Sequence, residues 1–276
     1  MNSRLVLGII TYKPGQNLIA RLGAALLQGY RLYIFDNSPE DDGVRKLAGE
    51  NPAGIVYMTC GKNAGLGFAL ASICARAYYD GCQALLFFDQ DTVFTHDTLD
   101  FIRGFYEQHA ELQKEYSAVV FNSKNIPMVE EGGLALNTVL LAVNSGSLYF
   151  LENLKRLNWH NINYFVDCVD YEFCLSTYNN GFKIGEYTKT PGFDHSAEQD
   201  DRMYKFFGAV RPMRAYPLSR VWDSIFATLK LLVKSVATGN YIFFYEIGKA
   251  TSKYLIVQVY VRIVSALKFF KIAHGK

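Results

Sequence analysis

Two carboxylates that flank a single residue are the sharpest chemical feature of this sequence. Asp89-Gln90-Asp91 directly follows the apolar run at residues 85–88, which predicts a buried strand. Two carboxylates so placed can face one hard divalent cation bound through oxygen. A cation there would stabilise a diphosphate as it leaves. The alternative is an ordinary acidic turn before the next helix, with Thr92 as its N-cap.

The elements that would position these acids alternate along the first half of the chain. Continuous apolar runs predict strands at residues 5–10, 31–35, 55–58 and 84–88. Apolar residues at helical spacing predict helices over residues 17–27 and 67–79. Uninterrupted apolar strands separated by helices are typical of a parallel sheet covered on both faces. Ligands bind beyond the carboxyl ends of such strands, and both Asp36 and the 89–91 acids fall there.

Beyond residue 110 the pattern is less regular. Further strands are predicted at residues 117–121, 136–143 and 182–186, with a helix over residues 151–157 and another that follows residues 164–172 and ends at Asn180-Gly181. No internal repeat or low-complexity linker is present. The predicted fold class is α/β, with a mostly parallel central sheet flanked by helices.

Composition narrows the class of protein. The 276 residues are 50% hydrophobic and carry a formal net charge of +2. The apolar content excludes a disordered chain. The low charge excludes binding to nucleic acid through bulk positive charge, which leaves only a local patch for such a role. We therefore expect a globular protein with no nucleic-acid partner.

Cysteine usage and the apolar runs bear on the compartment. The chain has five cysteines and no C-x-x-C pair, so neither a disulfide framework nor a thiolate zinc site is indicated. A reducing compartment is expected. The apolar run at residues 5–10 is too short for the core of a signal peptide. A membrane-spanning helix is not expected.

The last part of the chain differs from the rest in charge. Residues 217–276 contain nine Lys or Arg and two acids, a net charge of +7, which leaves −5 for residues 1–216. We therefore expect one domain over 1–216 and a helical appendage over 217–276. Apolar residues recur there at helical spacing, at Val221, Ile225, Leu229 and Leu232 and again at Leu255, Val259, Ile263 and Leu267. Basic amphipathic helices suit an anionic membrane surface; a cap on the first domain and a homodimer interface are the alternatives.

Several motifs, taken together and in order, resemble the inverting family 2 glycosyltransferases, whose fold is GT-A. They are Ile9-Ile10-Thr11-Tyr12, Phe35-Asp36-Asn37-Ser38, residues 62–69, residues 85–92, Asn144-Ser145-Gly146-Ser147-Leu148 and residues 165–175. The form Asp89-Gln90-Asp91-Thr92 is similar to the bacterial rhamnosyltransferase branch. The resemblance covers roughly residues 5–200.

The resemblance implies a nucleotide-sugar site. In it, Asp36 hydrogen-bonds the nucleotide base, and Thr11 and Tyr12 lie beside that carboxylate. Asn63 lies near the nucleotide, and Gln90 belongs to the same donor site.

The resemblance also implies a divalent metal, Mg²⁺ or Mn²⁺. Asp89 and Asp91 lie near the ribose and the metal, with Asp91 as the direct ligand. A histidine in the position of His195 completes the metal site in the family. The alternative is a histidine with a purely structural role.

Catalysis is implied for Asp170, which occupies the place of the family's general base. Without the resemblance, Asp167, Asp170 and Glu172 would indicate a solvated helix start, where acids are favoured by the helix dipole. With it, contacts to the acceptor are expected from Asp167, Glu172, Ser145 and Gly146.

The sequence departs from the family in two places. Ser176 stands where an Arg often follows the Cys-Leu pair, and Ala197-Glu198 stand where Leu-Gly often follows the histidine. The spacing Gly61-x-x-x-Gly65-x-Gly67 lacks the features of a phosphate-binding loop and is interpreted as a turn before a helix.

The resemblance thus implies transfer of L-rhamnose from dTDP-L-rhamnose to a lipid-linked acceptor of a surface polysaccharide such as O-antigen or capsule. The enzyme would be cytoplasmic and peripheral on the inner face of the bacterial plasma membrane. One alternative is another donor, UDP-galactofuranose or a UDP-hexose. A nucleotidyltransferase, with Lys62 as the basic residue near the phosphates, is another. The third is a scaffold that binds nucleotide-sugar or membrane without turnover.

Overall fold

The computed structural model describes residues 4–38, 40, 42–121, 136–195, 202–206 and 208–274. Two compact units make up the chain, Met1–Ser196 and Ala197–Lys276. The division lies before residue 217, where the composition changes, because a hairpin belongs with the helices that follow it. This hairpin, β11 (Arg202–Phe206) and β12 (Ala209–Met213), packs on helix α8 (Tyr241–His274) through a small core of Tyr204, Met213 and Val261.

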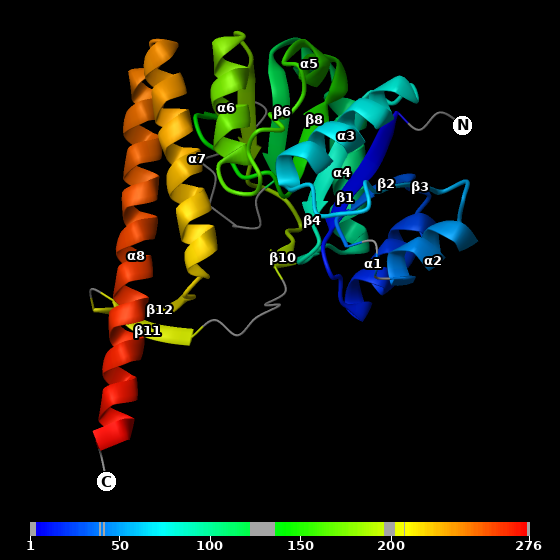
Figure 1. Ribbon diagram of the computed structural model, residues 1–276. Helices are drawn as coiled ribbons and strands as arrows, with labels where there is room; N and C mark the ends of the chain where they lie inside the picture. The colour runs from blue at the N-terminus through cyan, green and yellow to red at the C-terminus, as the bar shows by residue number, and fades with distance from the viewer. Residues whose placement is uncertain are drawn as a thin grey trace. The chain divides into compact units, whose positions relative to one another are not determined.

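An eight-stranded sheet forms the centre of the first unit (Figure 1). In sheet order its strands are β3 (Ile55–Met58), β2 (Leu32–Asp36), β1 (Leu5–Thr11), β4 (Ala84–Asp89), β8 (Ser147–Phe150), β6 (Tyr116–Phe121), β9 (Lys183–Tyr187) and β7 (Leu136–Val139). Every strand except β7 and β8 runs in one direction. The sheet is therefore mostly parallel, as predicted, and the expected strand at residues 136–143 is shorter than predicted.

Helices cover both faces of this sheet. They are α1 (Gln16–Leu27), α2 (Asp42–Glu50), α3 (Leu66–Tyr79), α4 (His96–Gln108), α5 (Leu151–Arg156) and α6 (Val169–Asn179), with a 3₁₀ turn at Ala110–Lys114. Alternate residues of β1 explain the two layers. Leu7 and Ile9 join one core with α1, α2 and α4, whereas Gly8 faces Ile73 of α3 on the other side.

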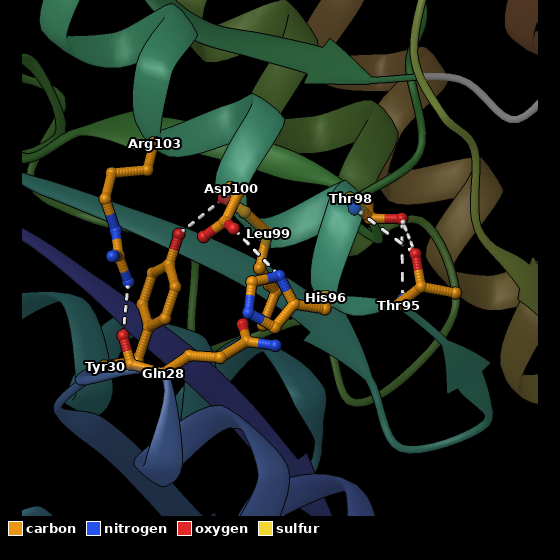
Figure 2. Close-up of polar contacts among 8 residues, drawn as sticks. All are labelled: Gln28, Tyr30, Thr95, His96, Thr98, Leu99, Asp100 and Arg103. Carbon is orange, nitrogen blue, oxygen red and sulfur yellow. Dashed lines mark hydrogen bonds and ion pairs between the residues drawn. The ribbon is translucent and has the colours of Figure 1, made fainter.

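Two short elements next to the predicted acids differ from the sequence-based expectation. Thr92 is not a helix cap, because it lies in β5 (Thr92–Val93), which pairs with β10 (Asp194–His195). The cap of α4 is Thr95, whose hydroxyl accepts a hydrogen bond from the Thr98 backbone in a capping box (Figure 2). The pairing of β5 with β10 thus holds the acidic turn, and helix α4 begins only after β5.

The helices of the second unit are α7 (Leu218–Ala237) and the long α8, which lie side by side (Figure 1). The face of α7 that is buried consists mainly of small residues, Ser224, Ala227, Thr228, Leu231 and Ser235. Its large apolar residues face outward instead, at Leu218, Trp222, Phe226, Leu229, Val233 and Val236. Among the described residues, no helix is both long and apolar enough to cross a membrane.

Candidate functional site

The carboxyl ends of β1, β2 and β4 lie side by side and bring three predicted site residues together. Thr11 is paired with Asp36 across β1 and β2, and Ile10 is paired with Asp89 across β1 and β4. Because parallel strands end at one edge of the sheet, these side chains share that edge.

Asp36 is fully buried and forms a hydrogen-bond network with its neighbours. One carboxylate oxygen accepts from the Thr11 hydroxyl (3.0 Å) and from the backbone N–H and hydroxyl of Ser38 (2.9 and 3.1 Å). The other oxygen accepts from the Tyr57 hydroxyl at 2.8 Å. A carboxylate has about four acceptor positions, so this network uses its capacity. Asp36 therefore ties β1, β2 and β3 together at the edge of the site.

Tyr57 is a site residue that the sequence did not reveal. It lies on β3 opposite Ile34, two residues before Asp36. Burial raises the pKa of the Tyr57 hydroxyl, and the hydrogen bond to Asp36 adds to that increase. A single tyrosine in a short apolar strand carries no signal of such a contact, because the partner comes from another strand.

Gln90 joins the ends of β1 and β4 by a double hydrogen bond. Its side-chain oxygen accepts from the Tyr12 backbone N–H at 2.7 Å, and its amide group donates to the Tyr12 carbonyl at 3.0 Å. The Gln90 carbonyl accepts from Arg21 of α1. The Gln90 side chain is thus engaged in shaping the edge, whereas the Tyr12 ring is 46% exposed there.

Ser145 is buried beside the predicted acids. Its hydroxyl accepts from the backbone N–H of Asp89 at 3.1 Å and lies 2.6 Å from the Thr92 hydroxyl. Gly146, at a φ of +81°, donates its N–H to the Phe87 carbonyl at 2.8 Å. A Cβ on Gly146 would lie 2.5 Å from the Phe193 ring. Ser145 therefore supports the 89–92 turn directly, whereas the contacts of Gly146 are to Phe87 and Phe193.

The backbone of His195 lies next to the same turn, because His195 is paired with Thr92 in the β5–β10 ladder. Asp89 and Asp91, both half-buried, offer carboxylate oxygens of the kind that hard divalent cations bind. Among the side chains described, no group of three or more His, Cys, Asp or Glu could hold a metal ion; the side chain of His195 lies outside that description. The chemistry of these two carboxylates is compatible with a hard divalent cation.

Asp170 lies in the first turn of α6 and is half-buried. Burial raises the pKa of its carboxyl group to about 6, and the nearby charge of Asp167 contributes in the same direction. The backbone N–H of Tyr171 donates to it at 2.9 Å, which limits the increase. A carboxylate with such a pKa is ionised at neutral pH and still basic enough to accept a proton.

Glu172 is buried on the same helix. It accepts hydrogen bonds from Asn161 at 3.3 Å and from Ser176 at 2.9 Å. Ser176 therefore binds this carboxylate. These contacts give Glu172 an internal supporting role.

Asn63 lies in the loop that precedes α3. Its side-chain oxygen accepts from the Gly65 backbone N–H at 3.0 Å, which closes a tight turn. Asn37, at the end of β2, accepts from the Ala64 backbone N–H at 2.9 Å. The loop is thus attached to the same sheet edge as Asp36.

A pocket of about 440 Å³ lies elsewhere in the first unit, at the start of β1. It is lined by Arg4, Leu5, Gly29, Tyr30, Gln83, Arg103, Tyr106, Glu107 and Ala110. Figure 2 shows that Arg103 donates to the Gln28 carbonyl and Tyr30 to the Leu99 carbonyl. None of the predicted site residues lines this pocket, so it is separate from the edge described above.

The fold and its site edge define the class: this is an α/β protein with the GT-A fold expected from the sequence. Solved structures agree. TarS from S. aureus (residues 1–349) is 15% identical with a TM-score of 0.51, over 70% of this chain and 60% of that one. GalNAc-T7, crystallised with UDP, GalNAc and Mn²⁺, is 10% identical with a TM-score of 0.56, over 82% of this chain and 47% of that one.

The chain therefore spans about half to three fifths of the length of these structural neighbours. No protein-family model matches the sequence, and no curated protein matches it either. At these identities the likeness establishes the fold alone.

Proposed function

We propose that this chain is a metal-dependent inverting glycosyltransferase that uses a nucleotide-sugar donor. The observation that carries the proposal is the half-buried Asp170, with a carboxyl pKa of about 6, in the first turn of α6. Helix α6 runs through a short turn into β9, which is parallel to β6. A helix that precedes a parallel strand starts near the edge where such strands end.

Asp170 would act as the general base. As the acceptor hydroxyl oxygen attacks the anomeric carbon, its proton passes to the Asp170 carboxylate and the bond from that carbon to the diphosphate breaks. A single displacement inverts the anomeric configuration. A divalent cation between Asp89 and Asp91 would offset the charge on the departing diphosphate.

The donor site would lie along the ends of β1 and β2. The exposed Tyr12 ring offers a face for the flat base. Direct contact between the nucleotide base and Asp36 would replace one of the hydrogen bonds that the Asp36 carboxylate now accepts. Asn63 and Gln90 would shape the loops on either side.

We favour dTDP-L-rhamnose as the donor, supported by the Asp89-Gln90-Asp91-Thr92 form, and a lipid-linked glycan as the acceptor. Outward apolar residues and excess basic charge on α7 and α8 support docking at an anionic membrane surface, which fits such an acceptor. A UDP-sugar is the alternative donor, since the structural neighbour GalNAc-T7 was crystallised with UDP and GalNAc.

A donor panel tests the proposal. The purified chain is titrated with dTDP-L-rhamnose, UDP-galactofuranose and a UDP-hexose, with Mn²⁺ or Mg²⁺ and again with EDTA, and slow donor hydrolysis is followed. We expect selective donor binding that EDTA abolishes. Asp91→Asn should weaken donor binding at least tenfold. The control is Glu111→Gln, which changes an exposed acid beyond α4 and should leave donor binding unchanged. Preference for a UDP-sugar would mean that the donor is not dTDP-L-rhamnose and would leave the proposed reaction type unchanged. Folded protein that binds none of the donors would contradict the proposal and favour a scaffold.

A further inference from the structure

The segment 158–168, which we call the strap, connects α5 to α6 and ends two residues before Asp170. Three of its non-glycine residues have left-handed backbone conformations, with φ of 60° at Asn158, 66° at Trp159 and 62° at Cys168. Such conformations are costly and persist only where the surroundings impose them. The strap is therefore held in shape by what packs against it.

On one side the strap lies against the start of α3. The Leu66 backbone N–H donates to the Phe165 carbonyl at 2.5 Å. A Cβ on Gly67 would lie 2.5 Å from the Tyr164 carbonyl oxygen and 2.7 Å from that of Asn161. The approach of the two backbones thus depends on the missing side chain.

Gly65 makes a second close approach. A Cβ there would lie 2.5 Å from the Phe165 carbonyl oxygen and 2.6 Å from its ring, and the φ of +84° itself favours glycine. The sequence-based interpretation of Gly65 and Gly67 as a turn before a helix is therefore incomplete, because it omits the packing partner.

On its other side the strap is fixed to α6. Asn161 donates to Glu172. The buried His160 ring stacks on Phe173, with centroids 4.7 Å apart, and meets Tyr149 edge-on. The strap is thus clamped between α3 and α6.

The start of α3 also continues into the donor side of the site. Ala64 is bonded to Asn37 at the end of β2, next to the buried Asp36. One short stretch, residues 63–67, therefore contacts both the edge of the predicted nucleotide site and the strap that leads to the predicted base.

We propose that Gly65 and Gly67 are positioning residues for Asp170: their close contact with the strap sets the base in register with the donor loop. This inference rests on the proposed function. It assigns to two glycines the alignment of the acceptor side of the site with the donor side.

The Gly67→Ala variant isolates this role. Gly67 lies within α3 with a helical backbone, where alanine favours the helix itself, so the strap carbonyls are what the new methyl group displaces. Because a misplacement of about 1 Å can cost roughly a hundredfold in rate, we expect kcat to fall by about that factor, with the donor KM changed less than about twofold. The control is Gly104→Ala on α4, where nothing lies within 4 Å of the new Cβ, and it should match wild type.

A pH profile separates positioning from general damage. A displaced strap admits water to Asp170, which lies among Asp167, Tyr171 and Cys174. Loss of burial lowers the pKa of Asp170, so the acidic limb of kcat should move from about pH 6 towards lower pH. Amide hydrogen exchange should also increase in residues 161–168 of Gly67→Ala and not of Gly104→Ala.

Each outcome decides between the two claims. Wild-type rates, an unshifted pH limb and unchanged exchange in Gly67→Ala would overturn the inference and leave the proposed function standing. An increase in KM alone would overturn it too, because the glycines would then serve donor binding. Faster exchange in Gly67→Ala, together with a wild-type protein that turns over no donor, would contradict the proposed function only. If Gly67→Ala does not fold, Asn161→Ala, which releases the strap from Glu172, should show the same losses.

Discussion

At the scale of single residues, the site edge is built by side chains that bind one another. Asp36, Gln90 and Ser145 are predicted to contact ligands, and in the structure each also makes hydrogen bonds to neighbouring strand ends. Sequence alone marks such residues, because polar groups after buried strands are conspicuous. It does not tell whether a carboxylate or hydroxyl faces a ligand or holds a loop, because the partners are distant in the chain.

The Tyr57→Phe variant tests the network around Asp36. It removes one donor from a buried carboxylate, and hydrogen bonds to charged groups contribute about 1.5–3 kcal/mol. We expect the free energy of unfolding, measured with urea, to fall by about 2 kcal/mol. The control is Tyr79→Phe, whose side chain is 72% exposed, and it should change stability by less than about 0.5 kcal/mol. Equal values for the two variants would mean that the Tyr57 hydrogen bond contributes nothing.

At the scale of elements, long apolar runs were predictable and short strands were not. Strands β1 to β4 were expected near their observed bounds. Strand β8 was missed because its four buried residues lead directly into α5, so no turn residue separates them. The pairing of β5 with β10 depends on residues about a hundred positions apart, which local patterns do not reveal.

Helical spacing also predicted α7 correctly without predicting which side is buried. Small residues form the contact between α7 and α8. One of them is Thr228, whose hydroxyl oxygen lies 3.1 Å from the hydroxyl oxygen of Thr251 on α8. The large residues Trp222 and Phe226, 57% and 60% exposed, face outward. Because the helices pack closely through small residues, the large apolar residues of α7 stay exposed at its surface.

Vesicle binding tests the role of that surface. We expect the full chain to co-sediment with vesicles that contain phosphatidylglycerol and to bind neutral vesicles less, because basic residues near an anionic surface contribute about 1 kcal/mol each. Trp222→Ser combined with Phe226→Ser should reduce binding at least tenfold. Leu27→Ser, which changes a 92% exposed leucine of α1, should not. If the double variant instead converts a dimer to a monomer in sedimentation velocity, the surface binds a second copy.

At the scale of the whole molecule, one edge of the sheet brings together the predicted site residues that follow β1, β2 and β4. The strand ends supply Thr11, Asp36 and Asp89, residues 63–67 are attached to Asn37 after β2, and the strap connects the start of α3 to α6. The fold class was predictable because strand runs and their order were clear. The contact between the start of α3 and the strap was not predictable, because it joins glycines to residues about a hundred positions later in the chain.

The most direct test of the central claim compares wild type with Asp170→Asn in donor hydrolysis across pH 4.5–9, with donor binding measured on the same samples. We predict a wild-type acidic limb near pH 6. Loss of the base should lower the rate at least about a hundredfold with donor affinity unchanged, and the sugar first released by wild type should have inverted configuration by NMR. An Asp170→Asn protein that retains the wild-type rate and pH profile would show that Asp170 is not the base.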